Sequence, residues 1–230
     1  MFTALTLLAV YVALGIPVAI ADIPWTLVTG DPSFVYRGAM AVVRAGLRAA
    51  HIHVEVEWRA PIVPGKSYLF FSNHLSNLDP PVLLPLLPGR TSIFIKKSLL
   101  KIPVLGYGMR LVSFIPVDRD GSVEGAKQSV EAGVTALAAG VHVTSFVEGT
   151  RSLDGRLLPF KKGPFYLAME SGAPVVPVTI RGTEKLMRKG SLKVYPGTVR
   201  VIFHAAIDPK DYATREELMV AVREAIEATT

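Results

Sequence analysis

The pairing of His74 with Asp79 is the feature of this sequence that most directly suggests chemistry. The two residues lie five positions apart in the run Asn73-His74-Leu75-Ser76-Asn77-Leu78-Asp79. A carboxylate within reach of one imidazole nitrogen fixes the ring tautomer and leaves the other nitrogen free to accept a proton. Such a pair also arises by chance, and Asp79 before Pro80 could serve only as a helix N-cap. His74 is therefore a candidate general base that needs support from other residues.

Two arginines provide that support because each follows a predicted strand. Arg119 comes after the apolar segment 111–117, and Arg151 comes after the apolar segment 142–147. In an open α/β sheet the carboxyl ends of the strands form the usual ligand crevice, so we expect both arginines near His74. The planar guanidinium fork suits the oxygens of a phosphate group.

Short residues surround Arg151 in Phe146-Val147-Glu148-Gly149-Thr150-Arg151-Ser152. Gly149 permits close approach of the backbone to a ligand, and Thr150 adds a hydroxyl donor, as does Ser152. We therefore predict that Gly149, Thr150 and Arg151 bind a phosphorylated substrate.

With these residues assembled, the chain resembles the 1-acyl-sn-glycerol-3-phosphate acyltransferase family. Four blocks carry the resemblance in order: Asn73-His74-x4-Asp79, Phe114-Ile115-Pro116-Val117-Asp118-Arg119, Phe146 to Ser152, and Val175-Val176-Pro177-Val178. The flanking Lys96 to Pro103 and Phe160-Lys161-Lys162-Gly163 are also similar. The resemblance extends from about residue 52 to about residue 207.

The resemblance implies an enzyme that moves a fatty acyl chain from acyl-CoA or acyl-carrier protein to the free hydroxyl of lysophosphatidic acid, giving phosphatidic acid. In that family the histidine is the base and the aspartate orients it, which corresponds to His74 and Asp79. The family also assigns the phosphate end of the acceptor to Arg119, Glu148 and Arg151. Since a carboxylate repels a phosphate, we expect Glu148 to orient Arg151 or the glycerol hydroxyls instead.

The residues that are missing from the sequence exclude competing chemistries. The chain has no cysteine and no Gly-x-Ser-x-Gly motif, which argues against an acyl-cysteine intermediate and against a serine esterase. Its five histidines show no zinc-ligand spacing, and no nucleotide-binding glycine motif occurs. We expect direct transfer with no metal and no cofactor beyond the acyl donor.

The amino-terminal segment is apolar enough to meet a membrane. Residues 1–21 carry no charge and would form a helix roughly 30 Å long, about the thickness of the hydrocarbon core of a bilayer. Gly15-Ile16-Pro17 predicts a break into the pieces 1–14 and 18–28, each too short to span. A re-entrant or interface-lying helix pair is then as plausible as a single span. Ala19-Ile20-Ala21 has the pattern of a signal-peptide cleavage site, but no basic residue precedes it.

Cations follow this apolar segment on a predicted helix from about residue 32 to residue 50. Arg37, Arg44 and Arg48 share one stripe of that helix, which fits either a solvated face or a membrane-surface helix. Their position predicts a catalytic domain on the cytoplasmic face. The net charge of +6 is explained by anionic lipid and a phosphate-bearing substrate, since no nucleic-acid-binding motif is present.

We divide the chain into membrane-anchoring helices at 1–50 and an acyltransferase domain at 51–230. The patterns predict an edge strand at 52–58, an inner strand at 174–180, a Pro196-Gly197 hairpin within 193–207, and helices at 122–139, 163–171 and 215–228. Strands that alternate with helices predict an α/β fold, with a mixed central sheet flanked by helices on both faces and an amino-terminal membrane-associated helical motif.

Two questions of function stay open in the sequence. The acceptor could be glycerol-3-phosphate or another lysophospholipid, and nothing specifies the acyl donor or chain length. The alternative to an enzyme is a non-catalytic membrane protein that has kept the fold and binds lipid. Retention of the base favours the enzyme, because a binding protein would need the arginines but not His74.

Overall fold

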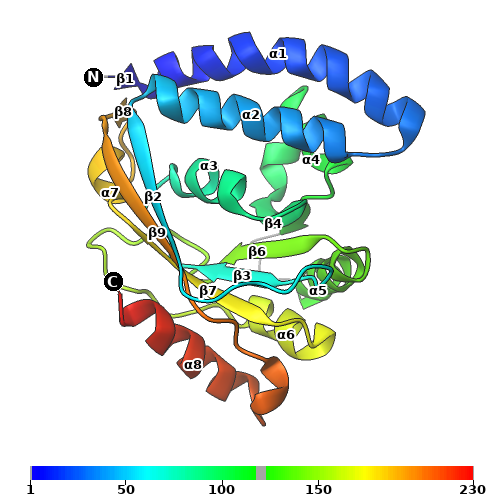
Figure 1. Ribbon diagram of the computed structural model, residues 1–230, viewed down its shortest axis with the longest axis vertical. Coiled ribbons are helices and arrows are strands. Elements are labelled where there is room, and N and C mark those ends of the chain that lie inside the picture. Colours follow the sequence, from blue (N-terminus) through cyan, green and yellow to red (C-terminus); the bar gives the residue numbers. More distant parts are fainter. Residues whose placement is uncertain (1, 118–122, 230) are drawn as a thin grey trace.

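A mixed β-sheet with helices on both faces forms the centre of the molecule (Figure 1). The computed structural model describes residues 2–117 and 123–229. Within those ranges, the main sheet contains β2 (Ile52–Trp58), β3 (Leu69–Ser72), β4 (Thr91–Lys96), β5 (Ile115–Val117), β6 (His142–Phe146), β7 (Val175–Arg181) and β9 (Gly197–Phe203), in the spatial order β2-β9-β7-β3-β6-β4-β5. The predicted fold class is confirmed, and β2 is the expected edge strand.

The five strands from β3 to β7 run parallel to one another, while β2 and β9 run in the opposite direction. The buried strands are short apolar runs, as expected where a parallel sheet is covered on both faces. Leu69, Phe70 and Phe71 of β3 are completely buried. Because the five strands are parallel, the loops after β3, β6 and β7 all leave at one edge of the sheet.

Side chains alternate between the two faces of each strand, and this alternation divides the hydrophobic core into two clusters. Phe70 belongs to the cluster shared with α2 (Ser33–Ala49), α3 (Asp79–Leu83) and the 3-10 helix η1 (Leu84–Leu86). Leu69 and Phe71 belong to the cluster shared with α5 (Val123–Ala138), α6 (Lys162–Ser171) and α8 (Arg215–Glu227). Figure 1 shows these two helical layers above and below the sheet. The remaining elements are β1 (Phe2–Thr3), α1 (Ala4–Thr29), η2 (Lys97–Lys101), α4 (Leu105–Leu111), α7 (Thr183–Leu186), β8 (Lys193–Val194) and η3 (Pro209–Asp211).

Two predicted elements are corrected by the structure. The apolar segment 111–117 is not one strand, because Leu111 ends α4 and only Ile115–Val117 forms β5. The Pro196-Gly197 hairpin is wrong as well. β8 pairs with β1, and β9 lies between β2 and β7. An inner position buries the apolar side chains of β9 far more completely than a two-residue partner would.

The predicted break in the amino-terminal segment is also wrong. Helix α1 continues through Pro17 and Pro24 and ends only at Thr29, before Gly30, whose φ is +72°. Tertiary packing explains why the helix continues. A Cβ on Gly38 or Gly46 of α2 would lie 2.1 or 2.0 Å from side-chain atoms of α1, so these glycines let the two helices approach closely.

Helix α1 exposes most of its apolar surface although it lies alongside α2 (Figure 1). The segment Leu5–Thr29 is long and apolar enough to cross a membrane, with a mean hydropathy of 2.1, and only 6% of its most apolar window is buried. Leu8 and Ile20 are 55% and 71% exposed. Helix α2 belongs to the core of the sheet domain, so α1 is attached to that domain along its length. The domain boundary at residue 50 stays a prediction.

Candidate active site

The loop after β3 places His74 at the carboxyl edge of the sheet. Asn73 ends the strand by bonding to the backbone of β7: its amide donates to the carbonyl of Ile180 at 2.9 Å, and its carbonyl accepts from the N–H of Ile180 at 2.7 Å. A buried side chain thus substitutes for the next backbone pair of the ladder. The chain turns away at His74, whose side chain is 17% exposed. The ring therefore reaches the surface from a rigid base.

Asp79 is buried directly behind the imidazole. Its Oδ2 atom lies 2.7 Å from Nδ1 of His74 and accepts the backbone N–H groups of Leu75 and Ser76 at 2.6 and 2.8 Å. A carboxylate surrounded by donors acts only as an acceptor, so Nδ1 must carry the proton. Nε2 is left with a lone pair and has no hydrogen-bond partner among the described residues. This is the arrangement predicted from the spacing of the two residues.

Two further residues hold this pair and were not predicted. Thr183 at the start of α7 donates its hydroxyl to Oδ1 of Asp79 at 2.5 Å. Phe146 at the end of β6 stacks on the His74 ring, with centroids 4.3 Å apart and planes 21° apart. Asp79 therefore has both oxygens occupied, and His74 has one ring face covered. A polar residue just past the apolar strand β7 was the only sequence signal for Thr183.

Glu148 faces inward and accepts a hydrogen bond from the backbone of the loop that carries His74. One carboxylate oxygen accepts the N–H of His74 at 2.7 Å, and the other accepts the N–H of Leu158 at 2.7 Å. The residue is 1% exposed, and burial raises the pKa of its carboxyl group, although the two backbone hydrogen bonds oppose that shift. The N–H of Ser152 donates to the carbonyl of His74 at 2.8 Å. The β6 loop thus holds both backbone polar groups of His74.

The turn after Glu148 presents cations at the same edge. Gly149 has a φ of +69°, and the side chain of Lys161 packs against it so closely that an added Cβ would lie 2.9 Å from Cγ of the lysine. Arg151 is partly exposed, and its guanidinium has no hydrogen bond or ion pair within the described parts of the chain. Lys189, which was not predicted as a site residue, donates to the carbonyl of Arg151 at 2.8 Å. Three cationic side chains therefore surround one turn, a chemistry that suits a phosphate.

Most of the predicted site residues come together at this edge. His74, Asp79, Glu148, Gly149 and Arg151 gather as expected, and Thr150 is exposed beside them. The expected orientation of Glu148 needs correction: its oxygens bind the backbone of two loops and not Arg151. Arg119 lies outside the described residues.

The chain matches a family model described as Acyltransferase over residues 53–181. A chloroplastic 1-acyl-sn-glycerol-3-phosphate acyltransferase, BAT2 of Brassica napus, is 40% identical over 156 residues, which is 66% of this chain and 42% of the relative. The alpha form of Homo sapiens is 33% identical over 150 residues, or 65% of this chain and 53% of that protein. The chain spans about half the length of these curated relatives. The crystal structure of the acyltransferase PlsC of Thermotoga maritima superposes with a TM-score of 0.78 at 26% identity and covers 97% of this chain and 93% of its own.

Proposed function

This chain belongs to the acyltransferase family, and from that premise we propose that it transfers a fatty acyl chain from acyl-CoA or acyl-carrier protein to the free hydroxyl of 1-acylglycerol-3-phosphate, giving phosphatidic acid. Relatives and the superposed structure are named as acyltransferases of 1-acyl-glycerol-3-phosphate, and the acyl donor and the product are part of the proposal. The single observation that carries the proposal is the His74–Asp79 pair, with one imidazole nitrogen occupied and the other free.

In the proposed reaction, Nε2 of His74 removes the proton from the acceptor hydroxyl as that oxygen attacks the thioester carbonyl carbon. The resulting tetrahedral intermediate collapses with cleavage of the C–S bond, and the protonated histidine returns the proton to the departing thiolate. Asp79 stabilises the imidazolium that forms between these steps. The chain contains no cysteine, so an acyl-cysteine intermediate within these 230 residues is excluded and direct transfer is the consistent route.

We assign the phosphate of the acceptor to the turn at Arg151. Its guanidinium has no partner among residues 2–117 and 123–229, Lys189 and Lys161 lie against the same turn, and Gly149 allows the backbone to approach a ligand. The second arginine in this proposal is Arg119. Glu148 acts as a positioning residue, because its carboxylate fixes the backbone of His74 and is turned away from solvent.

Helix α1 supplies the attachment to the lipid surface in this proposal. Its single charged residue, Asp22, points at Gly38 of α2, whereas its exposed face is apolar. Because α1 is packed along α2 and α2 is part of the sheet domain, a helix that lies in the membrane interface agrees with this packing better than one that crosses the bilayer. The arginines that follow α1 favour the cytoplasmic face.

The decisive experiment is an acyl-transfer assay of the purified chain in detergent. One labelled acyl-CoA and one labelled acyl-carrier protein are each offered with lysophosphatidic acid, glycerol-3-phosphate, lysophosphatidylcholine and monoacylglycerol. We expect phosphatidic acid from lysophosphatidic acid, at a rate well above that of the phosphate-free monoacylglycerol. Equal use of monoacylglycerol would reject the phosphate assignment, and a lack of transfer to every acceptor would favour the lipid-binding alternative.

A further inference from the structure

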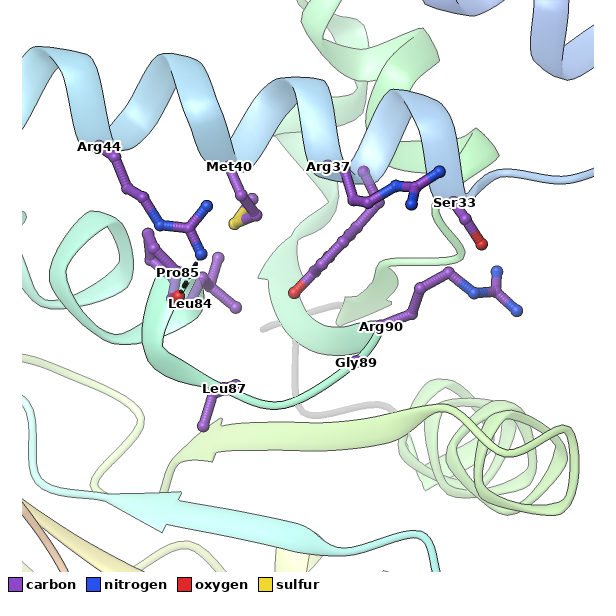
Figure 2. Close-up of a pocket in the computed structure, with 10 residues that line it drawn as sticks. Ser33, Arg37, Met40, Arg44, Leu84, Pro85, Leu87, Gly89 and Arg90 are labelled. Atoms are coloured by element: carbon purple, nitrogen blue, oxygen red, sulfur yellow. Dashed lines mark hydrogen bonds between the residues drawn. The ribbon is translucent and has the colours of Figure 1, made fainter. Parts of the chain in front are cut away.

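A cavity of about 420 Å³ lies between α2 and the segment that leads from η1 to β4 (Figure 2). Its lining includes four polar residues, Ser33, Arg37, Arg44 and Arg90. No step of the proposed acyl transfer uses any of them.

The cavity lies at the opposite edge of the sheet from His74. Gly89 and Arg90 precede β4, and an added Cβ on Gly89 would lie 3.8 Å from Nε2 of His142, the first residue of β6. The turn that contains Glu148 and Arg151 begins after Phe146, the last residue of β6. Five residues of parallel strand, about 16 Å, separate His142 from Val147. The cavity is therefore separate from the edge of the sheet that carries His74.

Charge gathers around the amino-terminal end of α2. Figure 2 shows the guanidinium groups of Arg37 and Arg90 extending toward the side where Ser33 lies, while Arg44 points down to the carbonyl of Pro85 and donates to it at 2.7 Å. The pKa of Asp31 is lowered by its hydrogen bonds to Ser33, and the positive charges of Arg90 and Arg37 add smaller contributions. Asp31 is exposed, so solvent weakens its offset of the charge of the two arginines.

The floor of the cavity is apolar. Met40, Leu84 and Leu87 line the space between the cationic groups. Tyr36 also lines it and is buried, and its hydroxyl lies beside Thr91, which lowers the pKa of the tyrosine against the larger raising effect of burial. Neither hydroxyl has a hydrogen bond of good geometry within the described residues. A polar ligand atom at this wall would therefore compete with Thr91 for the tyrosine hydroxyl.

We propose that this cavity binds the phosphate headgroup of an anionic membrane phospholipid, with the phosphate between Arg37 and Arg90 and the first part of the lipid against Met40 and Leu87. An apolar floor with cations at its mouth matches an amphiphile better than a free ion. The location agrees, because the loop from α1 to α2 adjoins Ser33 and the exposed surface of α1 is apolar. Lipid bound here would hold the amino-terminal end of α2 at the membrane without occupying the catalytic edge.

The test uses the absence of cysteine from the chain. Ser33→Cys places a single thiol in the cavity, and Ala138→Cys places a control thiol at an exposed position at the end of α5, where residues 134–141 carry no charge. Both proteins, in uncharged detergent, react with anionic sulfonatoethyl methanethiosulfonate and with its cationic trimethylammonium analogue. We expect the anionic reagent to be favoured roughly tenfold more at position 33 than at position 138, because cationic side chains surround only the first thiol.

Ligand protection then identifies the occupant. Dihexanoylphosphatidylglycerol should slow labelling at position 33 by about tenfold once its concentration exceeds its Kd tenfold, and should leave labelling at position 138 unchanged. Arg37→Gln/Arg90→Gln should abolish this protection, Arg37→Lys/Arg90→Lys should retain part of it, and the exposed pair Arg48→Gln/Lys101→Gln should retain all of it. Arg151→Gln should also leave it intact, because that residue lies at the catalytic edge.

Three outcomes would overturn the proposal. Equal protection by dihexanoylphosphatidylcholine would show that the net negative charge of the lipid is not recognised. Equal protection by inorganic phosphate would identify a site for the free ion. An absence of protection by any of the three probes would show that the cavity binds no phosphate group.

Discussion

The carboxylate of Glu148 accepts the backbone N–H of His74 at 2.7 Å, although 74 residues separate the two in sequence. The other oxygen of that carboxylate holds the N–H of Leu158. One buried side chain therefore joins the loop that carries the proposed base to the loop that carries the proposed phosphate site. The relative position of these two loops depends on this contact.

Replacement of Glu148 by glutamine should lower both stability and turnover. An amide offers one acceptor oxygen where two backbone donors need partners, and one unsatisfied buried donor costs about 1–3 kcal/mol. We expect a free energy of unfolding lower by about that amount and a reduced kcat. Chemical denaturation and initial rates measure the two effects, with Glu131→Gln on the exposed surface of α5 as the control.

The same residue predicts a dependence of stability on pH. Burial raises the pKa of Glu148 above its ordinary value of 4.5, so the folded state holds this proton more tightly than the unfolded state does. The stability that the protonated form contributes is fully present below pH 4.5 and is lost as the pH rises through the pKa of the folded state. The difference in unfolding free energy between wild type and Glu148→Gln should therefore shrink as pH rises above 4.5. Denaturation curves from pH 4 to pH 8 that show a constant difference would contradict this prediction.

His74→Ala should abolish acyl transfer while the fold survives. Loss of a general base typically lowers the rate by 10² to 10⁴-fold, about 3–5 kcal/mol of transition-state stabilisation. The ring is partly exposed and lies on the surface of the core, so the melting temperature should change little. His53→Ala on the exposed side of edge strand β2 is the control. Activity of the His74 variant within about threefold of wild type would reject its role as the base.

Thr183→Val tests whether the buried hydroxyl positions Asp79. The substitution preserves side-chain shape and removes the donor to Oδ1 of the carboxylate. We expect kcat to fall roughly tenfold with little change in KM, because the contact acts on the base and not on substrate binding. Thr183→Ser should restore most of the rate. A Thr183→Val enzyme with unchanged kcat would indicate that the backbone donors alone hold Asp79.

Arg151→Gln should raise the KM for lysophosphatidic acid and leave the KM for the acyl donor nearly unchanged. The proposed partner of this guanidinium is the phosphate of the acceptor, and a charged hydrogen bond contributes about 1.5–3 kcal/mol. Lys189→Gln should act in the same direction with a smaller effect. Arg156→Gln, which removes an exposed arginine nearby, is the matched control. Equal increases in both KM values would place Arg151 elsewhere in the mechanism.

Helix α1 should lose its membrane attachment when its outward face is charged. Leu8→Glu/Ile20→Glu changes two exposed positions without disturbing the packing on α2, and burial of each apolar side chain in lipid contributes about 1.5–3 kcal/mol. We expect the variant to move to the soluble fraction after vesicle flotation. Val63→Glu/Val220→Glu carries the same charge change at exposed apolar positions elsewhere and should remain bound. If the Val63→Glu/Val220→Glu protein also moved to the soluble fraction, membrane attachment would depend on a broader surface than α1.

Local patterns in the sequence were sufficient for the chemistry at His74. A five-residue spacing through a short turn lets Asp79 fold back onto the ring, because both residues belong to one loop between a strand and a helix. The apolar runs of β3, β6 and β7 predicted buried strands, and a parallel sheet brings the loops that follow them to one edge. These relationships depend on chain direction and on the periodicity of apolar residues, and both can be determined from a single sequence.

Tertiary structure alone decided the features that depend on which distant segments meet. Thr183 reaches Asp79 across 104 residues, and Glu148 turns inward because two backbone donors from separate loops converge on it. Helix α1 passes through two prolines because packing along α2 offsets the cost of the lost backbone hydrogen bonds. Local propensity and side-chain periodicity describe the immediate neighbours of a residue. The order of strands in a sheet, and the burial that order creates, set the partners that lie far away in sequence.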